Sequence, residues 1–296
     1  MPLFTVLRGF TVCMLVTPIL MVLGAWLQWD AASADIWQGL LQTVLPEYTL
    51  TSLLLCLLVA IGVVSMGSVG AAAVSLFDFP GRQTLSWLLL LPLAMPAYVV
   101  AYAYTDFLQY SGPLQNFLRL NLGLQGRVFP EVRSLGGAVL VFTVALYPYV
   151  YLLARTALSE RAVQLMEAAR LLGAPMSRRI REVALPLARP AVAAGVALAL
   201  METLADFGTV SYFAVDVFTT GIFKAWLSFG DRMASVHLSL MLLTFVLLVF
   251  YWEQHNRSRQ RYALVNTTSQ GVIPKRLQGT HALYASCFCG LTLFFA

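Results

Sequence analysis

Residues 154–190 read ARTALSERAVQLMEAARLLGAPMSRRIREVALPLARP, and they form the one long charged stretch in an otherwise apolar chain. Two helical patterns in it are separated by Gly173 and Pro175. Ser159 is the expected cap of the first helix, and Pro175 suits the start of the second. The charged residues are Arg155, Arg161, Arg170, Arg178, Arg179, Arg181 and Arg189 against Glu160, Glu167 and Glu182. A loop this basic, between apolar runs, is predicted to face the cytoplasm.

The centre of this stretch has the features of a docking surface. Glu167 is followed by Ala168 and Ala169, and Gly173 comes about one helical turn later. Small side chains let another backbone approach closely, and the Glu167 carboxylate can pair with an arginine. A helix–turn–helix of this kind fits a groove on a partner protein. The alternative is a charged loop that forms two surface helices without a partner.

The composition is that of a polytopic membrane protein embedded in a lipid bilayer. The chain has 296 residues, a mean hydropathy of +0.76 and 11% charged residues, whereas a soluble domain carries about 25%. The net charge of +5 comes from short loops and does not indicate nucleic acid. The four cysteines lie in apolar runs, so we expect no metal site. The sequence has no GxxxxGK[ST] motif, so any ATP is expected to be hydrolysed by another chain.

Six apolar runs are long enough to cross a bilayer, which takes about 20 residues. The first is interpreted as an uncleaved span rather than a signal peptide. Pro92 and Pro96 predict a kink in the third, and the long outer loop 105–134 has room for a short surface helix. The final run, 282–296, reaches roughly 22 Å, too short for a full crossing, and two alternatives are open. Either it is a tail that folds back at the interface, or it is a partial seventh span of a longer chain that has been cut here. The six runs are about 9–29, 49–76, 85–104, 135–153, 191–213 and 236–252.

The basic residues give these runs a consistent orientation. Fourteen of them, from Arg8, Arg82, the charged stretch and the region after the sixth run, fall on one side, and five fall on the other. Since cytoplasmic loops are enriched in lysine and arginine, the N terminus is predicted to be cytoplasmic.

The fifth run contains two acids, Glu202 and Asp206, one helical turn apart on one face. Carboxylates inside a membrane are costly and are usually functional. They are therefore candidates for lining a path that attracts a cation. The alternative is that they pair with a neighbouring helix or lie near the outer interface. Tyr98, Tyr102 and Tyr104 offer oxygens suited to iron, but an interfacial aromatic belt is the better interpretation.

The charged stretch resembles the EAA loop in the membrane subunits of bacterial ABC importers, which runs E-A-A, three residues, G, about nine residues, then I-x-L-P. Glu167, Ala168, Ala169, Gly173, Leu185 and Pro186 match, and Val183 stands at the isoleucine position. From about 50 to 262 the chain resembles the permease of ferric-iron-type importers. The segments ETLADFGT at 202–209 and FTTGI at 218–222 carry this part of the resemblance.

The resemblance implies an all-α, polytopic transmembrane helical bundle of the type I importer permease kind. Residues 1–48 would be a first span and outer loop, 49–262 a five-span core with the EAA loop at 155–190, and 263–296 a cytoplasmic linker and partial seventh span. Such permeases are usually about twice this length and have two homologous halves. The chain therefore resembles the N-terminal half and the start of the second.

The function implied is that of an inner-membrane subunit that passes ferric iron from a periplasmic binding protein to the cytoplasm. A dimer of ATP-binding cassette ATPases would grip the EAA loop, and a second permease half or copy would complete the path. The chain itself would bind no cofactor and would not be an enzyme, because ATP belongs to the partner. The residues implied in the grip are Glu167, Ala168, Ala169, Arg170, Gly173 and Pro186, with help from Arg178.

Three alternatives remain at this point. The cargo of the same kind of permease could be thiamine, a polyamine, sulfate or another small solute. A proton-coupled secondary transporter would use Glu202 and Asp206, but it needs no ATPase-docking loop. A membrane-embedded enzyme is disfavoured because His237, His255 and His281 are scattered in the sequence.

Overall fold

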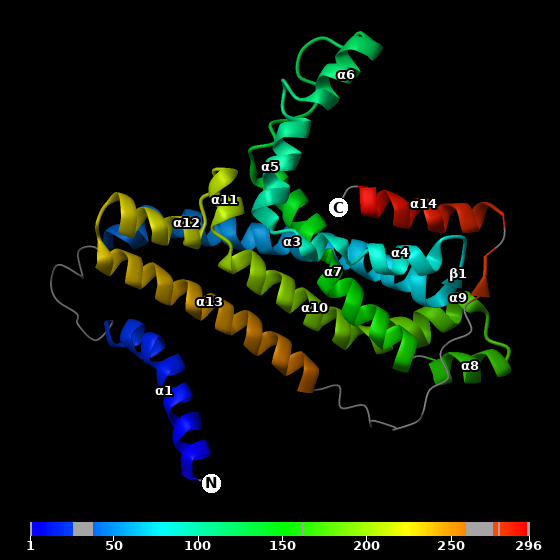
Figure 1. Cartoon of the computed structure of the whole chain (residues 1–296), viewed down its shortest axis with the longest axis horizontal. Helices are drawn as coiled ribbons and strands as arrows, with labels where there is room; N and C mark the ends of the chain where they lie inside the picture. The colour runs from blue at the N-terminus through cyan, green and yellow to red at the C-terminus, as the bar shows by residue number, and fades with distance from the viewer. Residues whose placement is uncertain (1, 26–37, 162, 259–274, 278, 295–296) are drawn as a thin grey trace. The chain divides into compact units, whose positions relative to one another are not determined.

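The computed structural model describes residues 2–25, 38–161, 163–258, 275–277 and 279–294, and helices dominate it (Figure 1). In this part of the chain, five helical segments are long and apolar enough to cross a membrane, and a bent pair makes a sixth if it counts as one span. The all-α prediction is confirmed. The five segments are Val6–Gly24, Leu45–Leu76, Leu135–Ser159, Met176–Ala205 and Arg232–Tyr251.

Some expectations lie outside the described residues. These are the end of the first apolar run, the first part of the loop that follows it, and most of the linker before the final run. The first run is helix α1 (Pro2–Ala25) as far as it is described.

The chain divides into two compact units, 1–53 with 216–248 and 54–215 with 249–296. In the first unit, α12 (Phe218–Phe223) and the π-helical turn η4 (Lys224–Ser228) pack with the start of α3 (Leu45–Leu76) and the first part of α13 (Arg232–Ser258). Residues 214–234, between the fifth and sixth apolar runs, are therefore largely helical. The buried core of this unit is Leu45, Tyr48, Phe218, Ala225, Ala234 and Leu238.

Helix α7 (Leu135–Thr156) is the centre of the second unit. Val150 on α7 is fully buried, and the backbones of α3 and α10 (Leu185–Ala205) approach it through two glycines. A Cβ at Gly67 would lie 2.7 Å from Val150 Cβ, and one at Gly195 would lie 2.6 Å from Val150 Cα. Only a residue without a side chain permits an approach this close, so both positions require glycine.

The third apolar run is broken rather than merely kinked. It is divided among α4 (Arg82–Leu88), the 3₁₀ turn η1 (Leu91–Ala94) and α5 (Ala97–Leu108), and α6 (Pro113–Leu122) follows it. The segments before and after Met95-Pro96 make an angle of 97°. A proline forces the residue before it out of the helical region, and Met95 is extended with φ −111° and ψ 127°. Helix α6 is the short helix that the sequence predicts in the loop 105–134.

The charged stretch differs from prediction at both of its ends. Ser159 does not cap a helix, because α7 continues through the π-helical turn η2 (Ala157–Arg161), where the Ser159 hydroxyl donates to Ser75 Oγ at 3.4 Å. The fifth span begins earlier than predicted, since Met176–Ala205 forms one helical segment. It also ends earlier, at Ala205, because Asp206 is extended, and the short helix α11 (Gly208–Tyr212) follows.

The C-terminal segment folds back on the loop that follows α3. Strand β2 (Lys275–Arg276) pairs in parallel with β1 (Phe77–Asp78), so the helices are accompanied by one two-residue ladder. Helix α14 (Thr280–Phe294) has 15 residues and packs against α4, with Ser286 Oγ donating to the Pro80 carbonyl at 3.1 Å. As predicted, it is shorter than a complete span.

Candidate functional site

The centre of the charged stretch is α8 (Val163–Leu171), which presents its acid and small residues on an accessible surface. Glu167 is partly exposed and pairs with Arg170, with 3.5 Å between Oε2 and Nη1. Ala168 is exposed, and Ala169 is half-buried. Exposed ion pairs contribute little to stability, so Glu167 and Arg170 are available to other partners.

Gly173 ends α8 in a conformation that favours glycine. Its φ is +80°, and a Cβ placed there would meet no atom within 4 Å. The Gly173 amide donates to the Arg170 carbonyl at 2.9 Å, and the Ala174 amide donates to the Ala169 carbonyl at 3.0 Å. These two bonds form a Schellman motif. Gly173 therefore turns the chain and leaves open space above the turn.

Sequence reasoning missed an exposed leucine pair, Leu171 and Leu172, at the end of α8. Their exposed fractions are 87% and 88%. These two exposed leucines, next to the glycine turn, form a small apolar patch on an otherwise charged loop. Exposed apolar patches of this kind mark interaction sites. The signal was visible as an apolar pair directly before the glycine in LLG. Together with Glu167, Ala168 and Gly173, the pair makes up what we call the docking face.

After the docking face, the chain forms one continuous helical segment, Met176–Ala205. It consists of α9 (Met176–Arg179), the π-helical turn η3 (Ile180–Ala184) and α10, with Pro175 at its start as predicted. Pro186 is half-buried at the start of α10, inside this continuous segment, where its missing N–H leaves one helical hydrogen bond unmade. Arg178 pairs with Glu182 at 2.9 Å on the surface.

The two acids of the fifth run lie at the far end of the same segment. Glu202 is exposed, and it forms no ion pair within the described ranges. Asp206 is half-buried and follows the last residue of α10, and its Oδ1 accepts a hydrogen bond from the Thr209 amide at 2.7 Å. The structure therefore gives Asp206 a local structural contact. It does not bring Glu202 or Asp206 to the docking face, since roughly 45 Å of helix separates the ends of a 30-residue segment.

Replacing Asp206 by alanine is expected to lower the free energy of unfolding by about 1 kcal/mol, because the Thr209 amide loses its acceptor. Asp206→Asn keeps a side-chain oxygen and should restore most of that stability. Thermal unfolding of the purified variants in detergent measures both. An equal loss of unfolding free energy in the two variants would show that the negative charge of Asp206, and not its contact with the Thr209 amide, stabilises the protein.

The tyrosines of the third run lie next to α11. The rings of Tyr102 and Tyr212 are 4.1 Å apart, and the Arg133 guanidinium lies 4.8 Å over the Tyr212 ring. A Cβ at Gly208 would be 3.2 Å from Tyr98 Cβ. These contacts favour packing over metal binding, and no group of three or more metal-binding side chains occurs among the residues the structure describes.

Comparison with known proteins gives a family match and several relatives. The model of the family described as "Binding-protein-dependent transport system inner membrane component" matches residues 64–262. The chain is 31% identical over 180 residues to the sulfate transport system permease protein CysT of Salmonella typhimurium, which covers 59% of this chain and 63% of the relative. It is 25% identical over 215 residues to the Fe(3+)-transport system permease protein FbpB 2 of Haemophilus influenzae. This match covers 72% of this chain and 38% of the relative. The chain thus spans less than two thirds of these relatives.

The fold is also similar to a solved structure. A bacterial ABC transporter involved in the import of the acidic polysaccharide alginate has a TM-score of 0.70 to this chain, with 17% sequence identity. The match covers 88% of this chain and 96% of that one. At this identity the likeness concerns the fold alone, which agrees with the predicted permease-like bundle.

Proposed function

Because this chain belongs to the family of binding-protein-dependent transport system inner membrane components, we propose that it is the membrane-spanning subunit of an ATP-driven importer of a small solute. It would lie in the bacterial inner membrane with a cytoplasmic N terminus, as its basic residues favour. The observation that carries the proposal is the exposed docking face, joined through a short turn to a helix long enough to cross the membrane.

The proposed motor is a pair of ATPase subunits, which bind ATP and grip the docking face from the cytoplasm. A conformational change can be driven only through contacts that differ between two states. Leu171, Leu172 and the open turn at Gly173 supply a shape that a groove can hold, and Glu167 and Arg170 supply charge. Movement of the gripped turn would reach Glu202 through the helical segment that begins at Met176, and Pro186 lies within that segment.

Two further partners complete the proposal. A periplasmic binding protein would deliver the cargo, and a second permease half or copy would close the path. ATP would be held by the ATPase, and this chain would bind no cofactor of its own. The solved alginate transporter is described in complex with a periplasmic protein that holds a pentasaccharide, which supports this kind of assembly.

The cargo we propose is ferric iron. The match to the Fe(3+)-transport relative covers 72% of this chain, and Glu202 places an exposed carboxylate on the transmembrane segment, where it would attract a cation. The second candidate is a tetrahedral oxyanion such as sulfate, favoured by the higher identity of 31% to the sulfate relative.

Purification of the full chain from detergent-solubilised membranes, with mass spectrometry of every bound chain, tests the proposed assembly. We expect to recover an ATPase subunit that carries a GxxxxGK[ST] motif. Transport that persists without any ATPase, and collapses with the proton gradient, would instead establish a secondary carrier.

Glu202→Gln separates the two cargo candidates. In the intact transporter, uptake of ferric iron should fall roughly fivefold, because one charge at contact distance contributes about 1 kcal/mol in water. Uptake of sulfate should be unchanged or faster. Glu131→Gln is the matched control, since Glu131 is also an exposed acid but pairs with Arg127 outside the transmembrane segments. Equal ferric uptake by Glu202→Gln and wild type would refute a cation path at Glu202.

A further inference from the structure

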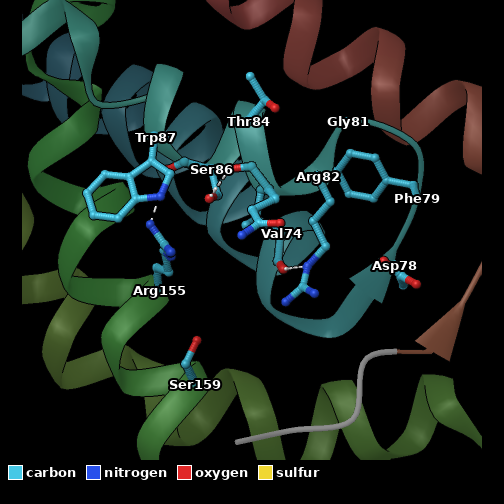
Figure 2. Close-up of a pocket in the computed structure, with 11 residues that line it drawn as sticks. Val74, Asp78, Phe79, Gly81, Arg82, Thr84, Ser86, Trp87, Arg155 and Ser159 are labelled. Atoms are coloured by element: carbon cyan, nitrogen blue, oxygen red, sulfur yellow. Dashed lines mark hydrogen bonds between the residues drawn. The ribbon is translucent and has the colours of Figure 1, made fainter.

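A polar cavity of about 610 Å³ lies in the second unit, between the end of α3, the turn that leads into α4, and the last turns of α7 (Figure 2). We call it the arginine cavity. The lining residues that matter here are Asp78, Arg82, Thr84, Trp87, Arg155 and Ser159. Its volume is within the range of small-molecule sites. None of these residues belongs to the docking face or to the pair Glu202 and Asp206.

Two guanidinium groups from different helices meet this cavity. Arg82 Nε donates to the Val74 carbonyl at 2.6 Å, and Arg155 Nη1 donates to the Ser86 carbonyl at 3.1 Å. Each of these hydrogen bonds fixes its arginine side chain through one N–H group of the guanidinium. A guanidinium has five N–H donors, so further donors remain on each group. Figure 2 shows both arginines reaching the cavity from α4 and α7.

The cavity carries an excess of positive charge. Neither Arg82 nor Arg155 forms an ion pair with a carboxylate in the part of the chain that the structure describes. Asp78 is the single acid in the described lining, against two arginines. Two fixed guanidinium groups without a carboxylate partner suit the binding of a phosphate group, whose oxygens accept paired N–H donors.

The surroundings indicate the source of that phosphate. The Trp87 side chain is 69% exposed beside the cavity, and the Arg155 guanidinium lies 5.9 Å from its ring centre. Tryptophan prefers the boundary between membrane and water. The cavity lies on the side that we propose to be cytoplasmic, because α7 leads from it into α8. Basic pockets between spans on that side bind phospholipid headgroups.

We propose that the arginine cavity binds a phosphate-bearing anion, supplied by the headgroup of an anionic phospholipid in the cytoplasmic leaflet. The phosphate would bridge Arg82 on α4 and Arg155 on α7, with the Trp87 indole against the glycerol region. Ser159, one turn beyond Arg155, lies in η2, which joins α7 to the helix that carries the docking face. A bound headgroup would therefore restrict the movement of η2, from which the loop with the docking face begins.

Native mass spectrometry of the full chain in detergent with phosphatidylglycerol tests this site. Wild-type protein should retain phosphatidylglycerol in preference to phosphatidylcholine. The Thr84→Glu variant puts a carboxylate into the cavity lining and leaves both arginines in place. It should weaken retention roughly fivefold, and Arg82→Gln with Arg155→Gln should weaken it further. Ser177→Glu is the control, because Ser177 is exposed on α9 and outside the cavity.

A second arm distinguishes the two sources of phosphate. If inorganic phosphate binds to wild type but not to Thr84→Glu, and phosphatidylglycerol shows no preference over phosphatidylcholine, the anion site stands and the lipid source is wrong. If neither ligand distinguishes wild type from Thr84→Glu, the anion site itself is overturned. Retention in detergent depends on neither ATPase binding nor transport, so failure here is separate from failure of the proposed function.

Discussion

Gly195→Leu is expected to destabilise the bundle by about 3 kcal/mol, at the upper end of the usual cost of overpacking. A Cβ at Gly195 would lie 2.6 Å from Val150 Cα and 3.0 Å from the Tyr149 carbonyl oxygen, which are backbone atoms of α7. Backbone cannot rotate away as the end of a flexible side chain can. The helices must therefore separate, and the extensive packing of α10 on α7 is lost.

Gly67→Leu should act in the same way, since its Cβ would lie 2.7 Å from Val150 Cβ and 2.9 Å from the Tyr147 carbonyl oxygen. Thermal unfolding of purified variants in detergent is the measurement. Gly290→Leu is the matched control, because it is also a helical glycine in an apolar segment but a Cβ there meets no atom within 4 Å. An unfolding midpoint of Gly195→Leu equal to that of Gly290→Leu would contradict the close approach.

Gly173→Trp should abolish co-purification of the ATPase while leaving the protein inserted in the membrane. The indole would occupy the open space above the turn, beside Leu171 and Leu172. A groove on the ATPase that fits a glycine turn could then no longer bind it. Glu167→Arg should have a similar effect, because it reverses the one acid of the docking face. The measurement is the amount of ATPase recovered per mole of permease from solubilised membranes.

The control for Gly173→Trp must carry the same backbone strain elsewhere. Gly126 has a φ of +82°, against +80° at Gly173, and a Cβ at either position meets no atom within 4 Å. Placing a side chain in the left-handed region costs roughly 1–2 kcal/mol at each site. Gly126→Trp should therefore match the stability loss of Gly173→Trp and retain the ATPase. Recovery of the ATPase with Gly173→Trp at the wild-type level would contradict the proposal that the ATPase binds the docking face.

Several features of this protein follow from local sequence. A run of about 20 apolar residues must be helical in a bilayer, because its backbone groups have no water to bond. For this reason the second, fourth and sixth runs coincide closely with helices α3, α7 and α13. The turn at Gly173 was equally predictable, since a helix that ends in a left-handed residue favours glycine. Glu167, Ala168, Ala169 and Gly173 accordingly lie together on α8 and its turn, whereas Leu185 and Pro186 of the same spacing begin α10.

Other features depend on contacts that hydropathy does not encode. Prolines in the third run and at the end of the charged stretch affect their helices differently. Pro96 separates segments that differ in direction by 97°, whereas Pro186 and Pro190 lie inside one segment from Met176 to Ala205. A proline removes one hydrogen bond in each case, and packing against other helices decides whether the helix survives. Extensive contact with α7 holds α10 together.

The sequence by itself therefore determined that the chain is a helical membrane protein with one long basic loop, because length, hydropathy and turn chemistry are local properties. Only the tertiary structure decided that Val150 on α7 lies between a glycine of α3 and a glycine of α10. The arginine cavity belongs to the same class, since Arg82 and Arg155 are 73 positions apart in the chain. Such juxtapositions arise from how helices pack, and packing depends on residues that are distant in sequence.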